Sequence, residues 1–220
     1  MIPLRDDQPT ERFPIVTILL IVLNAYVFIG WQLRIGLEHS VDQAGFLPIE
    51  LTSHEPGGWT HLFTSMFMHG GWMHLIGNMW FLWIFGNNIE DNCGSIRFLI
   101  FYLLCGVAAT LAFTALDPRS SIPLVGASGA ISGVLGAYLL HHPQARVLTL
   151  VPLGFFTRLM EIPAWVFLLV WIGLQVVSQL FAARAHGVES SGVAYAAHIG
   201  GFVAGMGLIV FFERTRRRRR

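Results

Sequence analysis

Four polar side chains stand inside otherwise apolar stretches of the sequence, and their types allow chemistry: His74, Asn78, Ser128 and His198. Serine and histidine together serve in nucleophilic catalysis, where the imidazole takes the proton of the hydroxyl group. His74 and Asn78 are four positions apart, which places them on one face of a helix, and both can donate hydrogen bonds. Polar groups inside a membrane are costly, so these four are functional candidates. Such a pair as His74 and Asn78 could instead hold two helices together.

Ser128 lies in the sequence Gly126-Ala127-Ser128-Gly129, after an irregular stretch that contains prolines. A serine at this place often does no more than cap a helix. The apolar helix that follows is predicted to end at His141, however, and its 14 residues rise about 20 Å, whereas a membrane core needs roughly 30 Å. The stretch before Ser128 must therefore enter the membrane, where irregular backbone is tolerated only inside protein or beside a watery cavity. We expect Ser128 at the floor of such a cavity, at the positive end of a helix.

Small residues recur every four positions in two of the apolar segments. They are Gly129 and Gly133 in one segment, and Gly201 and Gly205 in the other. This spacing lets two helices approach closely in a membrane. The first stripe follows Ser128 and the second follows His198, so we expect these two helices to touch beside both side chains. A lone histidine in a membrane is more often structural, but one opposite a serine on such a contact face favours catalysis.

The composition places the chain in a membrane. Hydrophobic residues make up 54% of the sequence and charged residues 12%, whereas a soluble domain carries about a quarter charged residues. Six apolar segments are candidate spans: 14–31, 72–88, 96–116, 128–141, 162–183 and 192–212. We therefore predict an all-α polytopic membrane protein with six transmembrane helices, of which the short fourth begins inside the membrane. The long segment 32–61 is expected to lie partly in the membrane interface.

The arginines predict the orientation of the chain. With both termini in the cytoplasm, eleven arginines lie on that side and three on the other, and without the C-terminal run the count is five against three. The domain organisation is then a cytoplasmic N-terminal segment, 1–13, a membrane domain, 14–212, and a basic cytoplasmic tail, 213–220. Such a tail after an apolar helix indicates contact with anionic lipid rather than with nucleic acid. We expect a prokaryotic plasma (inner) membrane.

Three motifs now resemble those of the rhomboid intramembrane serine proteases. They are His69-Gly-Gly-Trp-Met-His74-Leu-Ile-Gly-Asn78, then Gly126-Ala-Ser128-Gly129, then Ala197-His198-Ile-Gly-Gly201 with Gly205, in the second, fourth and sixth predicted spans. The resemblance implies that Ser128 is the nucleophile and His198 its general base. It implies that His74 and Asn78 line the oxyanion hole. It also implies an endopeptidase that cuts peptide bonds in or near transmembrane segments of membrane proteins.

The sequence departs from the family at two places. Many relatives have Trp-Arg where this sequence has Trp59-Thr60, and some have a tyrosine one turn after the nucleophile, where this sequence has Ser132. The support of His198 must then come from elsewhere. No acidic residue lies inside a predicted span, so we predict a Ser–His dyad without a third carboxylate. Neither a cofactor nor a metal ion is expected.

Two other classes of function are open. A catalytically inactive rhomboid-like protein would bind transmembrane clients, although such proteins usually lose the serine or the histidine, and this sequence keeps both. A metal site or transporter could use histidines as ligands, but no carboxylate or thiolate joins them in the spans. The histidines in question are His61, His69, His74 and His198. The sequence does not predict the physiological substrate, the biological process or the oligomeric state.

Overall fold

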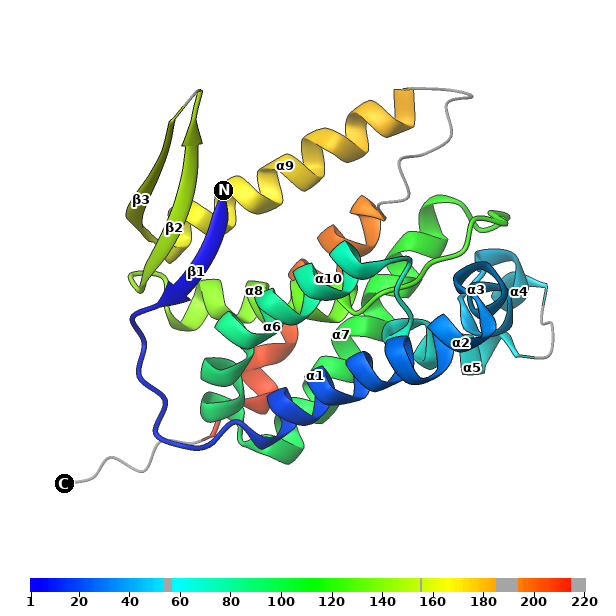
Figure 1. The fold of residues 1–220 in the computed structure, drawn as a ribbon, viewed down its shortest axis with the longest axis horizontal. Coiled ribbons are helices and arrows are strands. Elements are labelled where there is room, and N and C mark those ends of the chain that lie inside the picture. The colour runs from blue at the N-terminus through cyan, green and yellow to red at the C-terminus, as the bar shows by residue number, and fades with distance from the viewer. Residues whose placement is uncertain (54–56, 155, 185–193, 215–220) are drawn as a thin grey trace.

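The structure is a computed structural model that describes residues 1–53, 57–154, 156–184 and 194–214. It is mostly helical, and its long helices form a bundle, with α9 along the upper side in Figure 1. The long helices are α1 (Ile15–Val27), α6 (Trp72–Cys93), α7 (Ser95–Leu116), α8 (Ser128–His141), α9 (Ala164–Arg184) and α10 (Tyr195–Phe212). Each coincides with one of the six predicted spans to within a few residues, apart from α6, which continues five residues further.

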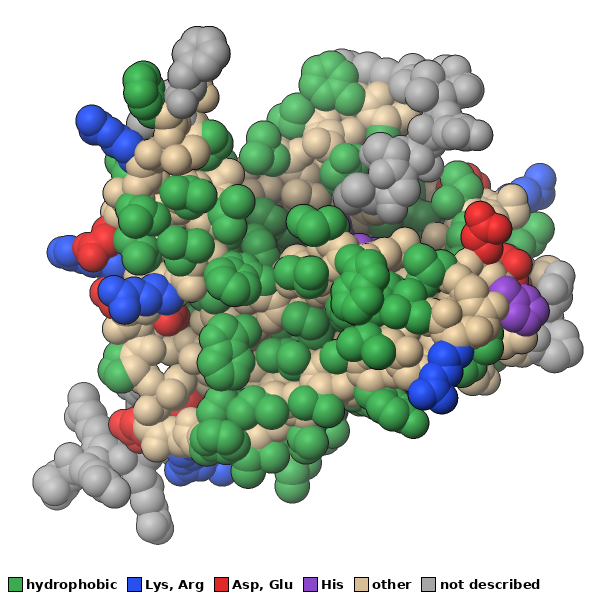
Figure 2. Space-filling model, in the orientation of Figure 1, with side chains coloured by type: hydrophobic (Ala, Val, Ile, Leu, Met, Phe, Trp, Pro, Cys, Tyr) green, Lys and Arg blue, Asp and Glu red, His purple; other side chains and the backbone are tan. Residues whose placement is uncertain are grey.

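Four helical stretches are long and apolar enough to cross a membrane, judged by length and composition. They are Ile15–Ile35, Ser95–Leu116, Ala164–Ala182 and Tyr195–Phe212. The first joins α1 to a π-helix (Phe28–Gln32) and α2 (Leu33–Ile35). Large hydrophobic side chains remain exposed over these helices, and Figure 2 shows them covering the middle of the molecule, with most charged side chains toward its two ends. An exposed apolar surface of this extent fits contact with lipid.

The segment between the first two spans, predicted as a long loop, contains short helices. These are α3 (Leu37–Ala44), α4 (Pro48–Thr52), α5 (Gly58–Thr64) and a 3-10 turn (Ser65–Phe67). They gather at the end of the bundle where α8 and α10 begin (Figure 1). This end is the one at which Ser128 and His198 lie.

The prediction of an all-α fold is wrong at the opposite end, where three strands form an antiparallel sheet in the order β1 (Ile2–Asp6), β2 (Arg146–Leu153) and β3 (Phe156–Pro163). The β2–β3 hairpin turns at Gly154, whose φ of 64° favours glycine. The hairpin was not predicted because it joins two strongly apolar helices and its own strands do not alternate polar and apolar residues. The indole of Trp80 on α6 donates a hydrogen bond of 2.6 Å to the carbonyl of Pro3, which ties β1 to the bundle.

Two acidic side chains secure this end of the bundle. Glu90, buried within α6, accepts hydrogen bonds from the backbone N–H groups of Val16 and Thr17 at 2.9 and 2.7 Å, and so caps the first turn of α1. Glu90 lies beyond the predicted span 72–88 and near the end of α6, because that helix extends to Cys93. Asp6 of β1 accepts a hydrogen bond from the Tyr138 hydroxyl, and burial raises the pKa of the Asp6 carboxyl.

Helix α8 is the centre of the bundle, buried without a break from Gly129 to Tyr138 and in contact with α6, α7 and α10. Its glycines allow the neighbours to approach the backbone itself. A Cβ atom on Gly201 would lie 2.0 Å from the carbonyl oxygen of Gly129, and one on Gly205 would lie 2.0 Å from that of Gly133. Both distances are far below any tolerated contact, so α8 and α10 touch through backbone atoms.

This contact predicts that Gly201→Ala destabilises the fold. The added methyl group meets backbone, which cannot rotate away, so we expect a loss of about 1–3 kcal/mol and a lower Tm in detergent. The matched control is Gly207→Ala on the same helix, where nothing lies within 4 Å of the new Cβ atom. That variant should be as stable as the parent or slightly more so, because alanine favours a helix. Equal Tm values for the two variants would contradict the account.

Candidate active site

The structure brings together the serine and the histidine that the sequence singled out. Ser128 Oγ lies 2.8 Å from His198 Nε2, although the two residues are 70 positions apart. Ser128 is the first residue of α8, and His198 lies in the first turn of α10. The backbone contact between Gly129 and Gly201 lies within one helical turn of both side chains. The packing of α8 against α10 therefore sets the distance between Oγ and Nε2. A hydroxyl and an imidazole in this arrangement can exchange a proton, which makes the hydroxyl a nucleophile.

Two side chains from α9 hold His198, and neither was predicted. The carbonyl oxygen of Gln175 lies 2.8 Å from His198 Nδ1. The ring of Trp171 lies beside the imidazole in a tilted arrangement, with centroids 5.9 Å apart and planes 35° apart. The signal for Gln175 was present in the sequence, since it is a polar residue in the middle of an apolar span. Ser132 does not support His198, because its hydroxyl donates a hydrogen bond of 2.6 Å to the carbonyl of Ser128.

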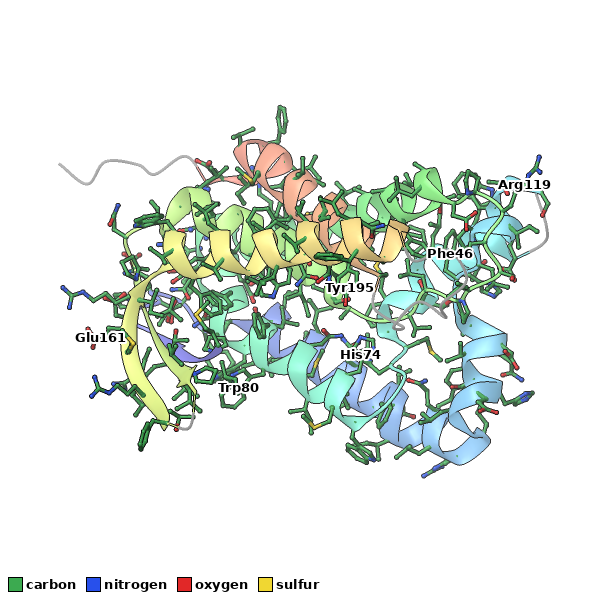
Figure 3. The ribbon with its side chains drawn as sticks, turned by 90° about the horizontal axis from the view of Figure 1, so that it is seen from above. Phe46, His74, Trp80, Arg119, Glu161 and Tyr195 are labelled. Carbon is green, nitrogen blue, oxygen red and sulfur yellow. The ribbon has the colours of Figure 1, made fainter. Side chains whose placement is uncertain are left out.

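His74 and Asn78 lie on α6 against the backbone that leads into Ser128. A Cβ atom on Gly126 would stand 2.6 Å from His74 Nε2 and 3.5 Å from Asn78 Nδ2. Figure 3 shows His74 on the side of α6 that faces the start of α10, which Tyr195 marks. Two hydrogen-bond donors thus flank the peptide two residues before Ser128.

Gly126 is required by this arrangement for two reasons. Its φ is 120°, a conformation that other residues rarely adopt, and any side chain would enter the space beside His74. Its own N–H donates a hydrogen bond of 2.9 Å to the carbonyl of Ser65, which fixes the approach to α8. Ser128 also borders a small pocket between α7 and α8, with room for about one water molecule. The structure thus places Ser128 at the start of a helix, as predicted, whereas the watery cavity beside it stays a prediction.

A buried chain of polar groups holds Asn78. Its amide donates a hydrogen bond of 3.0 Å to His69 Nε2, and His69 is fully buried. The backbone of His69 in turn pairs twice with the side-chain amide of Gln32, at 2.9 and 3.0 Å. Gln32 also donates to Ser40 at 2.9 Å. The direction of the Asn78 amide is therefore set by residues from the segment before α6.

His74 has a backbone partner at one ring nitrogen. Its Nδ1 atom accepts a hydrogen bond of 3.4 Å from the backbone N–H of Gly70, an arrangement that favours the ring proton on Nε2, the atom nearest to Gly126. The rings of His69 and His74 meet edge to face at 5.1 Å. Within the described part of the chain, no group of three or more His, Cys, Asp or Glu side chains could hold a metal ion.

Comparison with known proteins gives a match over the part of the chain that contains Ser128 and His198. The model of the Rhomboid domain matches residues 56–215. The chain is 30% identical over 192 residues to "Rhomboid protease GluP" of Bacillus subtilis, a match that covers 87% of this chain but 34% of that protein. It thus spans about a third of the Bacillus protein.

Two further relatives match over most of their own length. The chain is 28% identical over 191 residues to "Rhomboid protease GlpG" of Haemophilus influenzae, covering 87% of each protein. It is 28% identical over 210 residues to "Rhomboid-like protein 11, chloroplastic" of Arabidopsis thaliana, covering 93% of this chain and 68% of the plant protein. The similarity therefore extends well beyond the motifs around Ser128 and His198.

The geometry at Gly126 predicts that Gly126→Ala slows the reaction of Ser128 with a fluorophosphonate. The methyl group would displace His74 from the peptide before Ser128, and losing a donor of this kind costs on the order of 100-fold in rate. Gly154→Ala is the control, because Gly154 also has a positive φ but has nothing within 4 Å of the new Cβ atom. An unchanged labelling rate in Gly126→Ala would show that the space between Gly126 and His74 plays no part in the reaction of Ser128.

Proposed function

This chain belongs to the rhomboid family, and from that premise we propose that it is a serine endopeptidase that hydrolyses peptide bonds in or near transmembrane segments of membrane proteins. Ser128 is the nucleophile and His198 its general base. The single observation that carries the proposal is the distance of 2.8 Å between Ser128 Oγ and His198 Nε2. Two relatives that are named as proteases, of Bacillus subtilis and Haemophilus influenzae, support the same activity.

The reaction follows the chemistry of acyl transfer. His198 Nε2 takes the hydroxyl proton of Ser128 while Oγ bonds to the carbonyl carbon of the substrate, giving a tetrahedral intermediate. The imidazolium then gives its proton to the leaving amine as the C–N bond breaks, which leaves an acyl-enzyme. A water molecule, deprotonated by the same imidazole, attacks the ester and releases the second product.

Three donors surround the position where the oxyanion forms. They are the backbone N–H of Ser128, the amide of Asn78 and Nε2–H of His74. The first is an unpaired group at the start of α8, where the helix dipole also favours negative charge. Asn78 and His74 are held by His69 and Gly70, so both donors are in place before the substrate binds. Preorganised donors are the largest single contribution to many reactions of this type.

The membrane topology is also part of the proposal. All six long helices cross or enter the membrane, with α8 too short to span it at 14 residues and therefore starting within it. The N-terminal segment 1–13 and the tail 213–220 are cytoplasmic, on the side rich in arginine, and residues 215–220 of that tail lie outside the described residues. The protein is multi-pass and integral to the membrane, and we assign it to a prokaryotic plasma (inner) membrane.

The depth of the site requires water inside the membrane. Ser128 is 13 residues from the other end of α8, so it stands roughly 20 Å above that end. Hydrolysis at this depth needs a water-filled cavity that opens outward, near the short helices α3 to α5. The substrate is a membrane-embedded segment that unwinds locally, since a bond within an intact helix is not exposed to Ser128.

Replacing either member of the dyad should abolish cleavage. We expect Ser128→Ala and His198→Ala each to remove detectable cleavage of a purified transmembrane substrate in liposomes, with an unchanged Tm. Ser121→Ala, an exposed serine in the preceding segment, is the control and should cleave normally. Normal cleavage by purified Ser128→Ala would rule out the assignment. A parent protein that inserts and binds transmembrane segments but cleaves none would favour the inactive, client-binding alternative.

Asn78→Ala should be slow rather than inactive. The other two donors remain, so we expect kcat to fall by about 10²- to 10³-fold with a smaller change in KM, because the lost contact forms mainly in the transition state. Asn87→Ala, on the same helix but away from the dyad, is the matched control. A fall in kcat below about twofold would exclude Asn78 from the oxyanion hole.

A further inference from the structure

Gln175 lies on α9, in the middle of an apolar helix, and contacts the candidate base directly. We propose that Gln175 is a positioning residue for His198, whose amide oxygen holds the imidazole in the tautomer and orientation that the reaction with Ser128 needs. The inference rests on the proposed function and deepens it, since it assigns the group that takes the place of a third carboxylate.

The geometry forms one continuous line of three side chains. Gln175 Oε1 lies 2.8 Å from His198 Nδ1, and His198 Nε2 lies 2.8 Å from Ser128 Oγ. Both ring nitrogens are thus occupied, one by an acceptor and one by the nucleophile. Three different helices, α9, α10 and α8, supply the three groups.

The tautomer follows from the acceptor. A neutral imidazole has one N–H group, and the hydrogen bond to a carbonyl oxygen places that proton on Nδ1. Nε2 is then unprotonated and accepts the proton of Ser128 Oγ. If Gln175 presented its NH2 group instead, the proton would move to Nε2, and His198 could not act as a base.

Helix α9 also fixes the plane of the ring. Trp171 lies one turn before Gln175 and contacts the imidazole in a tilted arrangement at 5.9 Å, and it stacks on Phe202 of α10 at 6.3 Å. Gln175 therefore controls rotation within the plane of the ring, while Trp171 limits tilting out of it. Ser132, at the position where some relatives carry an aromatic residue, bonds to the Ser128 carbonyl instead.

A neutral amide suits a site inside a membrane. A buried carboxylate would have to be desolvated, which is unfavourable unless the carboxylate is fully paired. An amide oxygen orients the imidazole without that cost but stabilises the transient imidazolium less than a carboxylate would. Removing an orienting carboxylate from a triad costs about 10⁴-fold in kcat, so for Gln175 we expect a smaller loss of about 10- to 100-fold.

The experiment uses three variants of the full chain in liposomes. Gln175→Leu keeps the size of the side chain but removes the acceptor. Gln175→Glu keeps an acceptor oxygen in either ionisation state and has no NH2 group. Gln179→Leu is the matched control, one turn further along α9. For each we would measure kcat and KM for a transmembrane substrate, the rate of fluorophosphonate labelling, and Tm.

We expect Gln175→Leu to lower kcat and the labelling rate by about 10- to 100-fold at similar KM and Tm. In Gln175→Glu, kcat and the labelling rate should both lie within about fivefold of the parent's values. Gln179→Leu should have the parent's values. A Gln175→Leu variant with the parent's kcat would overturn the inference, as would equal losses in the Leu and Glu variants. If one of these two results is found while Ser128→Ala is inactive, the role of Gln175 is wrong but the proposed function stands. An active Ser128→Ala would contradict both the role of Gln175 and the proposed function.

Discussion

The site depends on the direct backbone contact between α8 and α10. Because Gly201 and Gly205 bring α10 against the carbonyls of Gly129 and Gly133, the first residues of both helices meet, and Ser128 lies within hydrogen-bond distance of His198. No covalent link or bound ion is needed to hold the pair. A wider separation of the two helices by one methyl group would move the hydroxyl out of reach of the base.

The surroundings of the pair follow from the membrane. Polar side chains there are stabilised by partners inside the protein, and the described residues supply neutral ones to Asn78 and His198. Asn78 bonds to His69, whose backbone is held by Gln32, and His198 bonds to Gln175. These contacts also fix the directions of the Asn78 amide and the His198 imidazole, the groups that would face the reacting carbonyl in the proposed mechanism.

The sequence predicted the long helices well, and also the contact between α8 and α10 beside Ser128 and His198. Apolar segments define helices with little ambiguity, and α8 has the predicted bounds because glycine and proline mark its start. The β2–β3 hairpin and the short helices before α6 were missed, since their patterns are local and weak beside those of the spans. Gln175 and Trp171 were missed because contact with His198 depends on how α9 crosses the bundle, which periodicity does not determine.

The central claim is that His198 activates Ser128 and no other nucleophile. It is tested most directly by treating the protein in liposomes with a fluorophosphonate and locating the adduct by mass spectrometry. The account predicts a single adduct on Ser128 in the parent protein and none in His198→Ala, with both proteins folded. An adduct on another residue, or equal labelling of Ser128 without the histidine, would contradict it.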